Sequence, residues 1–111
     1  MNNNLSESIS LIDSIIEKNN SNNNCEVYVS PSFPFLKDAK VKCNSTEIKV
    51  LAQNVSHHAK GALTGDVSCS MLQSIDINSV IIGHSERRTV FKETDQMLLK
   101  KIELCLKNDF E

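Results

Sequence analysis

Residues with acid–base and nucleophilic side chains stand side by side in the segment VIIGHSERR, residues 80–88. His84 and Ser85 follow a short apolar run and Gly83. A neutral histidine can donate a hydrogen bond to a substrate carbonyl and can move a proton between adjacent oxygens. A serine beside a base can act as a nucleophile. The segment therefore fits a histidine acid, a serine hydrolase, or an ordinary turn whose histidine is tied to a carboxylate or a carbonyl oxygen.

The serine-hydrolase interpretation depends on the residues that flank Ser85. A nucleophile elbow has the pattern Gly-x-Ser-x-Gly because small residues must flank the serine on a strained strand-to-helix turn. Residues 83–86 fit four of the five positions, but the fifth is Arg87, which carries a bulky side chain. The histidines of the chain, at positions 57, 58 and 84, all precede this serine. The pattern therefore disfavours a serine nucleophile.

The setting of His84 favours the histidine. It follows an apolar run and precedes Ser85-Glu86-Arg87-Arg88, which can begin a helical turn. The start of a helix presents free N–H groups and a partial positive charge, which disfavour a protonated imidazole and lower its pKa. We therefore expect a neutral His84 that can polarise a carbonyl group.

Strands and helices alternate along the chain. Residues 5–18 have helical spacing of apolar residues, and Asn4 with Glu7 fits a capping box. The alternation predicts an α/β protein with a parallel sheet and right-handed crossovers. Three strands are too few for a closed barrel, which typically needs about 250 residues. The expected elements are helix 5–18, an asparagine-rich loop 19–24, strand 25–30, a short helix 35–40, strand 48–53, a long loop 54–67, a short helix capped by Ser68, strand 79–83 buried on both faces, and a last helix capped by Thr94.

Composition excludes several classes of partner. A formal net charge of −2 gives no electrostatic case for nucleic acid or an anionic membrane surface. No apolar run approaches the roughly 20 residues that span a bilayer, and the polar start MNNN lacks a secretory apolar region. We therefore expect a cytoplasmic location, with an organelle lumen as the alternative.

The potential metal ligands are scattered. The 4 cysteines lack the spacing of a zinc site or a redox pair. We expect them to be free thiols, mostly buried. His57 and His58 are adjacent but have no third ligand nearby, so we expect no metal and no cofactor.

Two longer segments carry a specific resemblance. AQNVSHHAKGALTGDVS (Ala52 to Ser68) and VIIGHSERRTVFKETD (Val80 to Asp95) resemble the triosephosphate isomerase family, and the similarity extends more loosely over the whole chain. The resemblance implies a partial (β/α)8 TIM barrel, in which residues 1–111 form a single incomplete domain of three parallel strands with flanking helices. It also implies the glycolytic and gluconeogenic interconversion of dihydroxyacetone phosphate and glyceraldehyde 3-phosphate, without a cofactor, by a homodimer.

The resemblance assigns roles to individual residues. His84 matches the neutral electrophile that polarises the triose carbonyl, a known property of this family. Glu86 matches a catalytic acid of the same turn. Ser85 and Asn54 match supporting residues, the latter at a strand end. The loop 54–67 matches a segment that inserts into the partner subunit. Its interface residues are Thr64, which reaches the partner's active site, and Asp66, which pairs with Arg87 across the interface.

Other parts of the family pattern are missing from these residues. The asparagine and lysine of the family's first strand have no match in residues 1–4, and its general-base glutamate lies on the sixth strand, beyond Glu111. Without a base, abstraction of a carbon-bound proton has no agent. We therefore expect the isolated chain to be inactive. The alternative is a non-catalytic barrel remnant or a fragment that binds a partner through the Thr64 loop.

Overall fold

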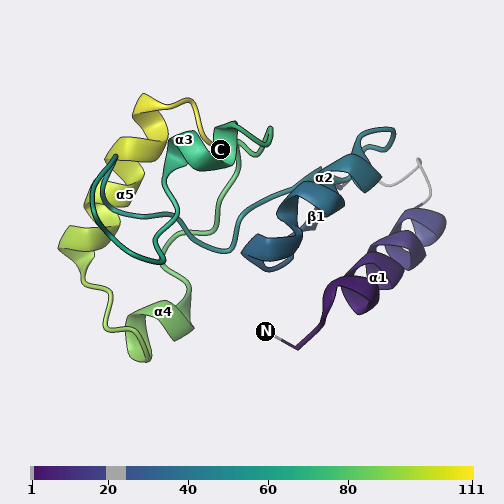
Figure 1. Ribbon diagram of the computed structural model, residues 1–111, viewed down its shortest axis with the longest axis horizontal. Helices are drawn as coiled ribbons and strands as arrows, with labels where there is room; N and C mark the ends of the chain where they lie inside the picture. The colour runs from purple at the N-terminus through teal and green to yellow at the C-terminus, as the bar shows by residue number, and fades with distance from the viewer. Residues whose placement is uncertain (1, 20–24) are drawn as a thin grey trace.

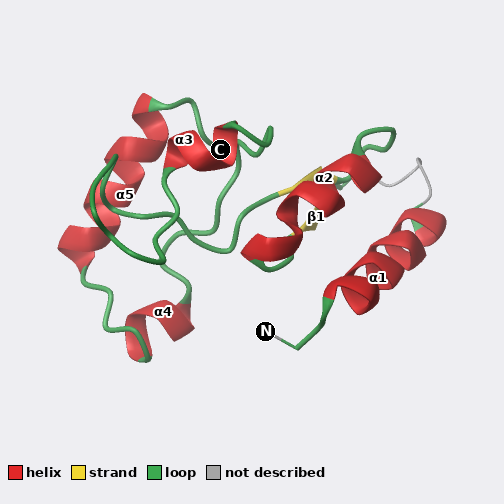
Figure 2. Ribbon diagram, viewed as in Figure 1, coloured by secondary structure: helices red, strands yellow, loops and turns green. Residues whose placement is uncertain are grey.

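Helices flank a small parallel sheet in the computed structural model, which describes residues 2–19 and 25–111 (Figure 1). Helices α1 and α2 pack against each other, and α2 also covers the second strand. Figure 2 shows the two short strands beside α2, with long loops leading to the later helices. The elements are α1 Leu5–Lys18, β1 Tyr28–Val29, the 3-10 turn η1 Phe33–Phe35, α2 Leu36–Cys43, β2 Lys49–Val50, α3 Cys69–Gln73, α4 Ser85–Thr89 and α5 Asp95–Lys107.

The helix starts follow their capping residues. Asn4 Oδ1 accepts from the Glu7 N–H at 3.0 Å, and Glu7 Oε2 accepts from the Asn4 N–H at 2.8 Å. This confirms the predicted capping box and the helix 5–18. Ser68 caps α3 and Thr94 caps α5 in the predicted way, each accepting an N–H three residues on. The asparagine-rich loop 19–24 begins where α1 ends, but its residues 20–24 lie outside the described residues.

The sheet is parallel, as predicted, but its strands are shorter than the sequence suggests. Tyr28 pairs with Lys49 and Val29 with Val50, so two residues of each predicted six-residue strand are ladder-paired. The outer edge of β1 has no neighbouring strand among the described residues. Because strand geometry is held by cross-strand hydrogen bonds, apolar alternation alone overestimates strand length where a partner is lacking.

The third predicted strand, 79–83, is reduced to one parallel bridge between Val80 and Ala52. The Ala52 N–H donates to the Ser79 carbonyl at 2.9 Å, and the Ile81 N–H donates to the Ala52 carbonyl at 2.8 Å. Residues 80–82 are half-buried rather than enclosed on both faces. On their other side the described part of the chain offers only the Glu111 carbonyl, which accepts from the Val80 N–H at 3.1 Å. A strand predicted to be buried on both faces is therefore half-buried and lies at an open edge of the described sheet.

The buried core is built from the helices, from Val29 and Val50 of the two strands, and from the loops that join these elements. Leu36, Leu72 and Ile77 are each at most 1% exposed. The loop 54–67 forms no helix or strand, as predicted, but anchors itself through Val55, which is 1% exposed. No described helix combines the length and apolar character needed to cross a membrane.

Gly83 has a conformation that fits glycine alone. Its φ of 73° lies in the left-handed region, and an added Cβ would lie 3.3 Å from Leu98 Cδ1. We expect Gly83→Ala to lower the free energy of unfolding by about 1–3 kcal/mol, measured by urea denaturation, because alanine is strained at this φ and its Cβ would also crowd Leu98. Gly65→Ala is the matched control: φ is 92° there, but nothing lies within 4 Å of the added Cβ, so the loss should be smaller. Parent-like stability of Gly83→Ala would contradict this account.

Candidate functional site

His84 is the residue from which α4 begins. Its Nδ1 accepts a hydrogen bond from the Glu86 N–H at 3.3 Å, so the imidazole itself caps the helix. Because a capping nitrogen needs a free lone pair, Nδ1 carries no proton in this arrangement, and the ring proton lies on Nε2. The predicted helical turn is confirmed. His84 can therefore offer an Nε2–H donor to a ligand.

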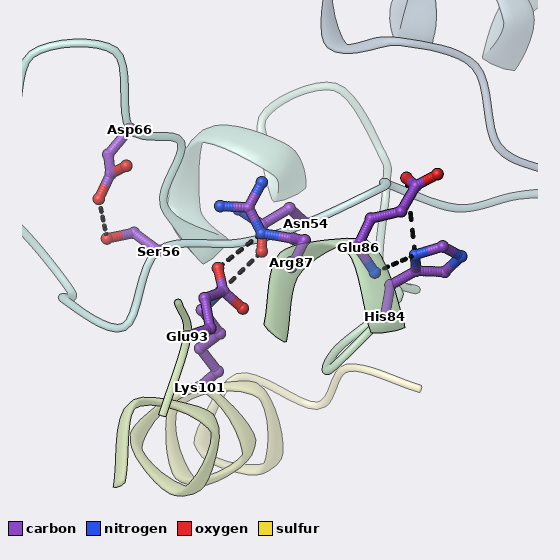
Figure 3. A network of polar contacts seen from close by, with 8 residues as sticks. All are labelled: Asn54, Ser56, Asp66, His84, Glu86, Arg87, Glu93 and Lys101. Atoms are coloured by element: carbon purple, nitrogen blue, oxygen red, sulfur yellow. Dashed lines mark hydrogen bonds and ion pairs between the residues drawn. The ribbon is translucent and has the colours of Figure 1, made fainter. Parts of the chain in front are cut away.

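The residues around this histidine are exposed. The His84 side chain is 50% and the Glu86 side chain 79% exposed. Glu86 Oε2 lies 3.7 Å from His84 Nδ1, which is beyond hydrogen-bond distance for a neutral ring. Ser85 occupies the first position of α4, and its carbonyl accepts from the Thr89 hydroxyl at 2.8 Å. Figure 3 shows Glu86 and His84 at one end of the network, both attached to this turn.

A buried ion cluster contacts α4, the short helix that His84 caps, through Arg87. Arg87 Nε donates to Glu93 Oε1 at 2.6 Å, and Lys101 Nζ donates to the same oxygen at 2.6 Å. Lys101 also donates to Asn54 Oδ1 at 2.7 Å. Glu93 is 6% and Lys101 1% exposed. The cluster thus joins three segments, namely the start of the long loop, α4 and α5 (Figure 3).

The interface residues expected from the resemblance lie apart from one another within the chain. Asp66 accepts from the Ser56 hydroxyl at 2.7 Å, and this bond closes the base of the long loop. Arg87 pairs with Glu93 instead of Asp66. Thr64 is exposed at the far end of the loop. Within one chain the structure therefore brings Asn54 and Arg87 into one network and leaves Thr64 and Asp66 outside it.

Glu93 and Lys101 were not predicted from the sequence as residues near the site. Lys101 lies three residues after Leu98 and four before Cys105, and all three are buried, so a charged side chain occupies the apolar face of α5. A lysine on an apolar helical face is rarely buried unless it is paired, so the position of Lys101 could have indicated a buried charge partner. Its partner Glu93 lies just before the Thr94 cap, where spacing alone gives no indication of a contact with Arg87.

The potential metal ligands form no site in the described residues. They include no group of three or more histidine, cysteine or acidic side chains placed to hold a metal ion. The rings of His57 and His58 contact each other at a tilt of 50°, with centroids 4.1 Å apart. Partial burial and the nearby His58 lower the pKa of His57. All 4 cysteines are free, and Cys43, Cys69 and Cys105 are buried.

Comparisons with known proteins give the family. A family model described as Triosephosphate isomerase matches residues 1–111, the full length of the chain. This chain belongs to the triosephosphate isomerase family. A triosephosphate isomerase of Flavobacterium johnsoniae is 42% identical over 109 residues, which cover 98% of this chain and 44% of the relative. One of Clostridium tetani is 44% identical over 109 residues, covering 98% of the chain and 42% of the relative.

A third triosephosphate isomerase matches over a shorter segment of the chain. A triosephosphate isomerase of Dictyostelium discoideum is 41% identical over 83 residues, 75% of this chain and 32% of the relative. The chain spans less than half the length of the curated relatives it matches. The family is thus established over the whole of this chain, and residues that these relatives possess elsewhere have no counterpart in it.

The charge state of Glu93 makes stability depend on pH. Burial acts to raise the pKa of Glu93, but hydrogen bonds from Lys101 and Arg87 outweigh it and hold the pKa below its ordinary value of 4.5. As pH falls, the Glu93 carboxyl therefore takes up its proton at a higher pH in the unfolded chain than in the folded chain. The stabilisation that this group gives above about pH 4.5 is lost as pH falls through its pKa in the folded chain. We expect urea denaturation between about pH 6 and 3 to show a steeper loss for the parent than for Glu93→Gln. Parallel pH profiles of stability for the two proteins would contradict this role of Glu93.

Proposed function

We propose that this chain is the part of a triosephosphate isomerase that supplies the electrophile His84. The reaction interconverts dihydroxyacetone phosphate and glyceraldehyde 3-phosphate by moving a proton between adjacent carbons. The observation that carries the proposal is the Nδ1 hydrogen bond from the Glu86 N–H at 3.3 Å, which leaves the ring proton on Nε2. A neutral donor of this kind polarises a carbonyl and can give its proton to the carbonyl oxygen, which becomes a negatively charged enediolate oxygen when the adjacent carbon loses its proton.

The remaining residues have supporting parts in this proposal. Glu86 acts as the acid of the same turn, and its backbone N–H donates to the His84 ring. Ser85 sets the first turn of α4, and Asn54 holds the start of the long loop through Lys101. The general base and the phosphate-binding groups come from segments outside these 111 residues. The parallel arrangement of β1, β2 and the Val80 bridge supports their place in a (β/α)8 barrel that further strands complete.

We also propose a homodimer in the cytoplasm, acting in glycolysis and gluconeogenesis as the family name suggests. The exposed loop 54–67 provides Thr64 and Asp66 for the contact, and Arg87 provides the opposite charge. Support comes from Arg87: only its Nε is hydrogen-bonded among the described residues, so its terminal nitrogens are available to a carboxylate of another subunit.

A chimaera tests the proposed reaction. In the chimaera, the 109 matched residues of this chain replace the corresponding segment of the Flavobacterium johnsoniae relative, and the relative supplies the rest of the barrel. We expect the chimaera to convert dihydroxyacetone phosphate in a coupled assay, and the isolated 111-residue chain to show no turnover. The relative with the matched segment deleted is the control. A folded chimaera without activity would refute the proposal.

A further inference from the structure

The buried cluster of Arg87, Glu93, Lys101 and Asn54 has features that stability alone does not explain. Two cations share a single carboxylate oxygen, Glu93 Oε1, while Oε2 is buried without a hydrogen-bond partner. Removing such groups from water costs several kcal/mol per ion by general estimates, roughly what their mutual attraction returns. Apolar side chains of similar volume often stabilise a fold equally well. The cluster therefore holds the segments that it joins in one arrangement, with a desolvation cost that apolar side chains would not have.

The contacts show which arrangement is fixed. The Arg87 N–H donates to the His84 carbonyl at 2.9 Å, which places Arg87 one turn after the histidine. The Arg87 side chain reaches Glu93, and the Glu93 N–H donates back to the Arg87 carbonyl at 3.1 Å. Glu93 thus holds α4 by its backbone and by its side chain.

Lys101 extends this connection to the other side of the site. It lies in the middle of α5 and touches both Glu93 Oε1 and Asn54 Oδ1. Asn54 begins the long loop, two residues after Ala52, which bridges to Val80. A single ammonium group therefore sets the distance between a strand end and the helix that His84 caps (Figure 3).

We infer that Glu93 and Lys101 are positioning residues, which set the placement of the His84 turn relative to the strand end at Asn54. The expected effect on turnover rests on the proposed function. The contacts that link the His84 turn to the strand end at Asn54 do not, because they lie within this chain. Active-site groups must be held to within a fraction of an ångström, and a misplacement of 1 Å can cost about 10²-fold in rate.

The test uses an apolar replacement of the pair. Glu93→Leu/Lys101→Met removes both charges and preserves volume, so the chain should still fold. We record NMR spectra of the labelled 111-residue chain and follow the backbone amides of Asn54 and Glu86 and the ring nitrogens of His84. In the double variant these signals should move, and the His84 ring should lose its fixed Nδ1 acceptor signature. Lys100→Met, which removes an exposed lysine from the same helix, should leave them in place.

The outcomes separate positioning from other roles. Unchanged signals at His84 and Asn54 in the folded double variant would overturn the inference. Equal changes in Lys100→Met would also overturn it, because the effect would then follow from any substitution on α5. Loss of folding in the double variant would overturn it as well, because the pair would then be a stability element.

Turnover separates this inference from the proposed function. In the chimaera, the double variant should lower kcat by about 10²-fold with little change in KM or in melting temperature. An inactive parent chimaera would refute the proposed function and leave the NMR result standing. An active parent with an equally active double variant would refute the positioning role alone.

Discussion

Replacing His84 with glutamine is expected to lower kcat of the chimaera by about 10²–10⁴-fold, the usual contribution of a positioned acid–base group. Glutamine can hydrogen-bond a carbonyl oxygen, but its amide cannot give up a proton and take one back at the same atom. The loss should therefore appear in kcat, with a much smaller change in KM. The measurement is steady-state conversion of dihydroxyacetone phosphate in a coupled assay.

The matched control for this substitution is in the same chain. His58→Gln makes the identical change in the exposed loop 54–67, and its kcat should stay close to that of the parent. Ser85→Ala tests the rival nucleophile and should also retain most activity, because Ser85 only begins α4. If His84→Gln kept parental kcat, or if Ser85→Ala abolished it, the histidine assignment would fail.

The second large effect is on stability. Glu93→Leu is expected to lower the free energy of unfolding by about 3–5 kcal/mol, because it leaves the Lys101 ammonium buried without a counter-charge. Lys101 is 1% exposed and would then retain only the Asn54 oxygen as a partner. Urea denaturation of the chain measures this loss, either as a lower midpoint or as the disappearance of the cooperative transition.

Two further variants identify the cause of that loss. Glu103→Leu makes the same change at an exposed position of α5 and should cost little. Glu93→Leu/Lys101→Met should recover most of the stability lost in the single variant, because the buried Lys101 charge is then removed and the Arg87 side chain, 28% exposed, remains in reach of water. A single variant as stable as Glu103→Leu would show that the cluster is not energetically coupled.

The helices were predictable because hydrogen bonds between neighbouring residues determine where they begin. The Asn4–Glu7 capping box, the Ser68 cap and the Thr94 cap each need only an oxygen and an N–H within one turn. Strand length was not predictable from the same chain. Ladder pairing depends on a neighbouring strand, and the one bridge that residues 79–83 form in the described part of the chain is to Ala52, which continues β2. Apolar runs therefore located the strands but did not fix their extent.

The site was predictable to the same degree. The sequence located His84 and its helical turn, because Gly83 and the following polar residues determine that turn locally. It gave no indication that Lys101 bonds Glu93 and Asn54, since these residues are separated by 8 and 47 positions. Such contacts depend on how α5 is rotated against the loop, which spacing within one helix does not determine.

The most direct test of the electrophile is the infrared carbonyl band of bound dihydroxyacetone phosphate. A neutral Nε2–H donor polarises the C=O bond and lowers its stretching frequency below that of the free substrate. We expect the chimaera to show this lowered band, and its His84→Ala variant, which has no side-chain donor at that position, to show a band close to that of the free substrate. The same lowered band in both proteins would contradict the role of His84.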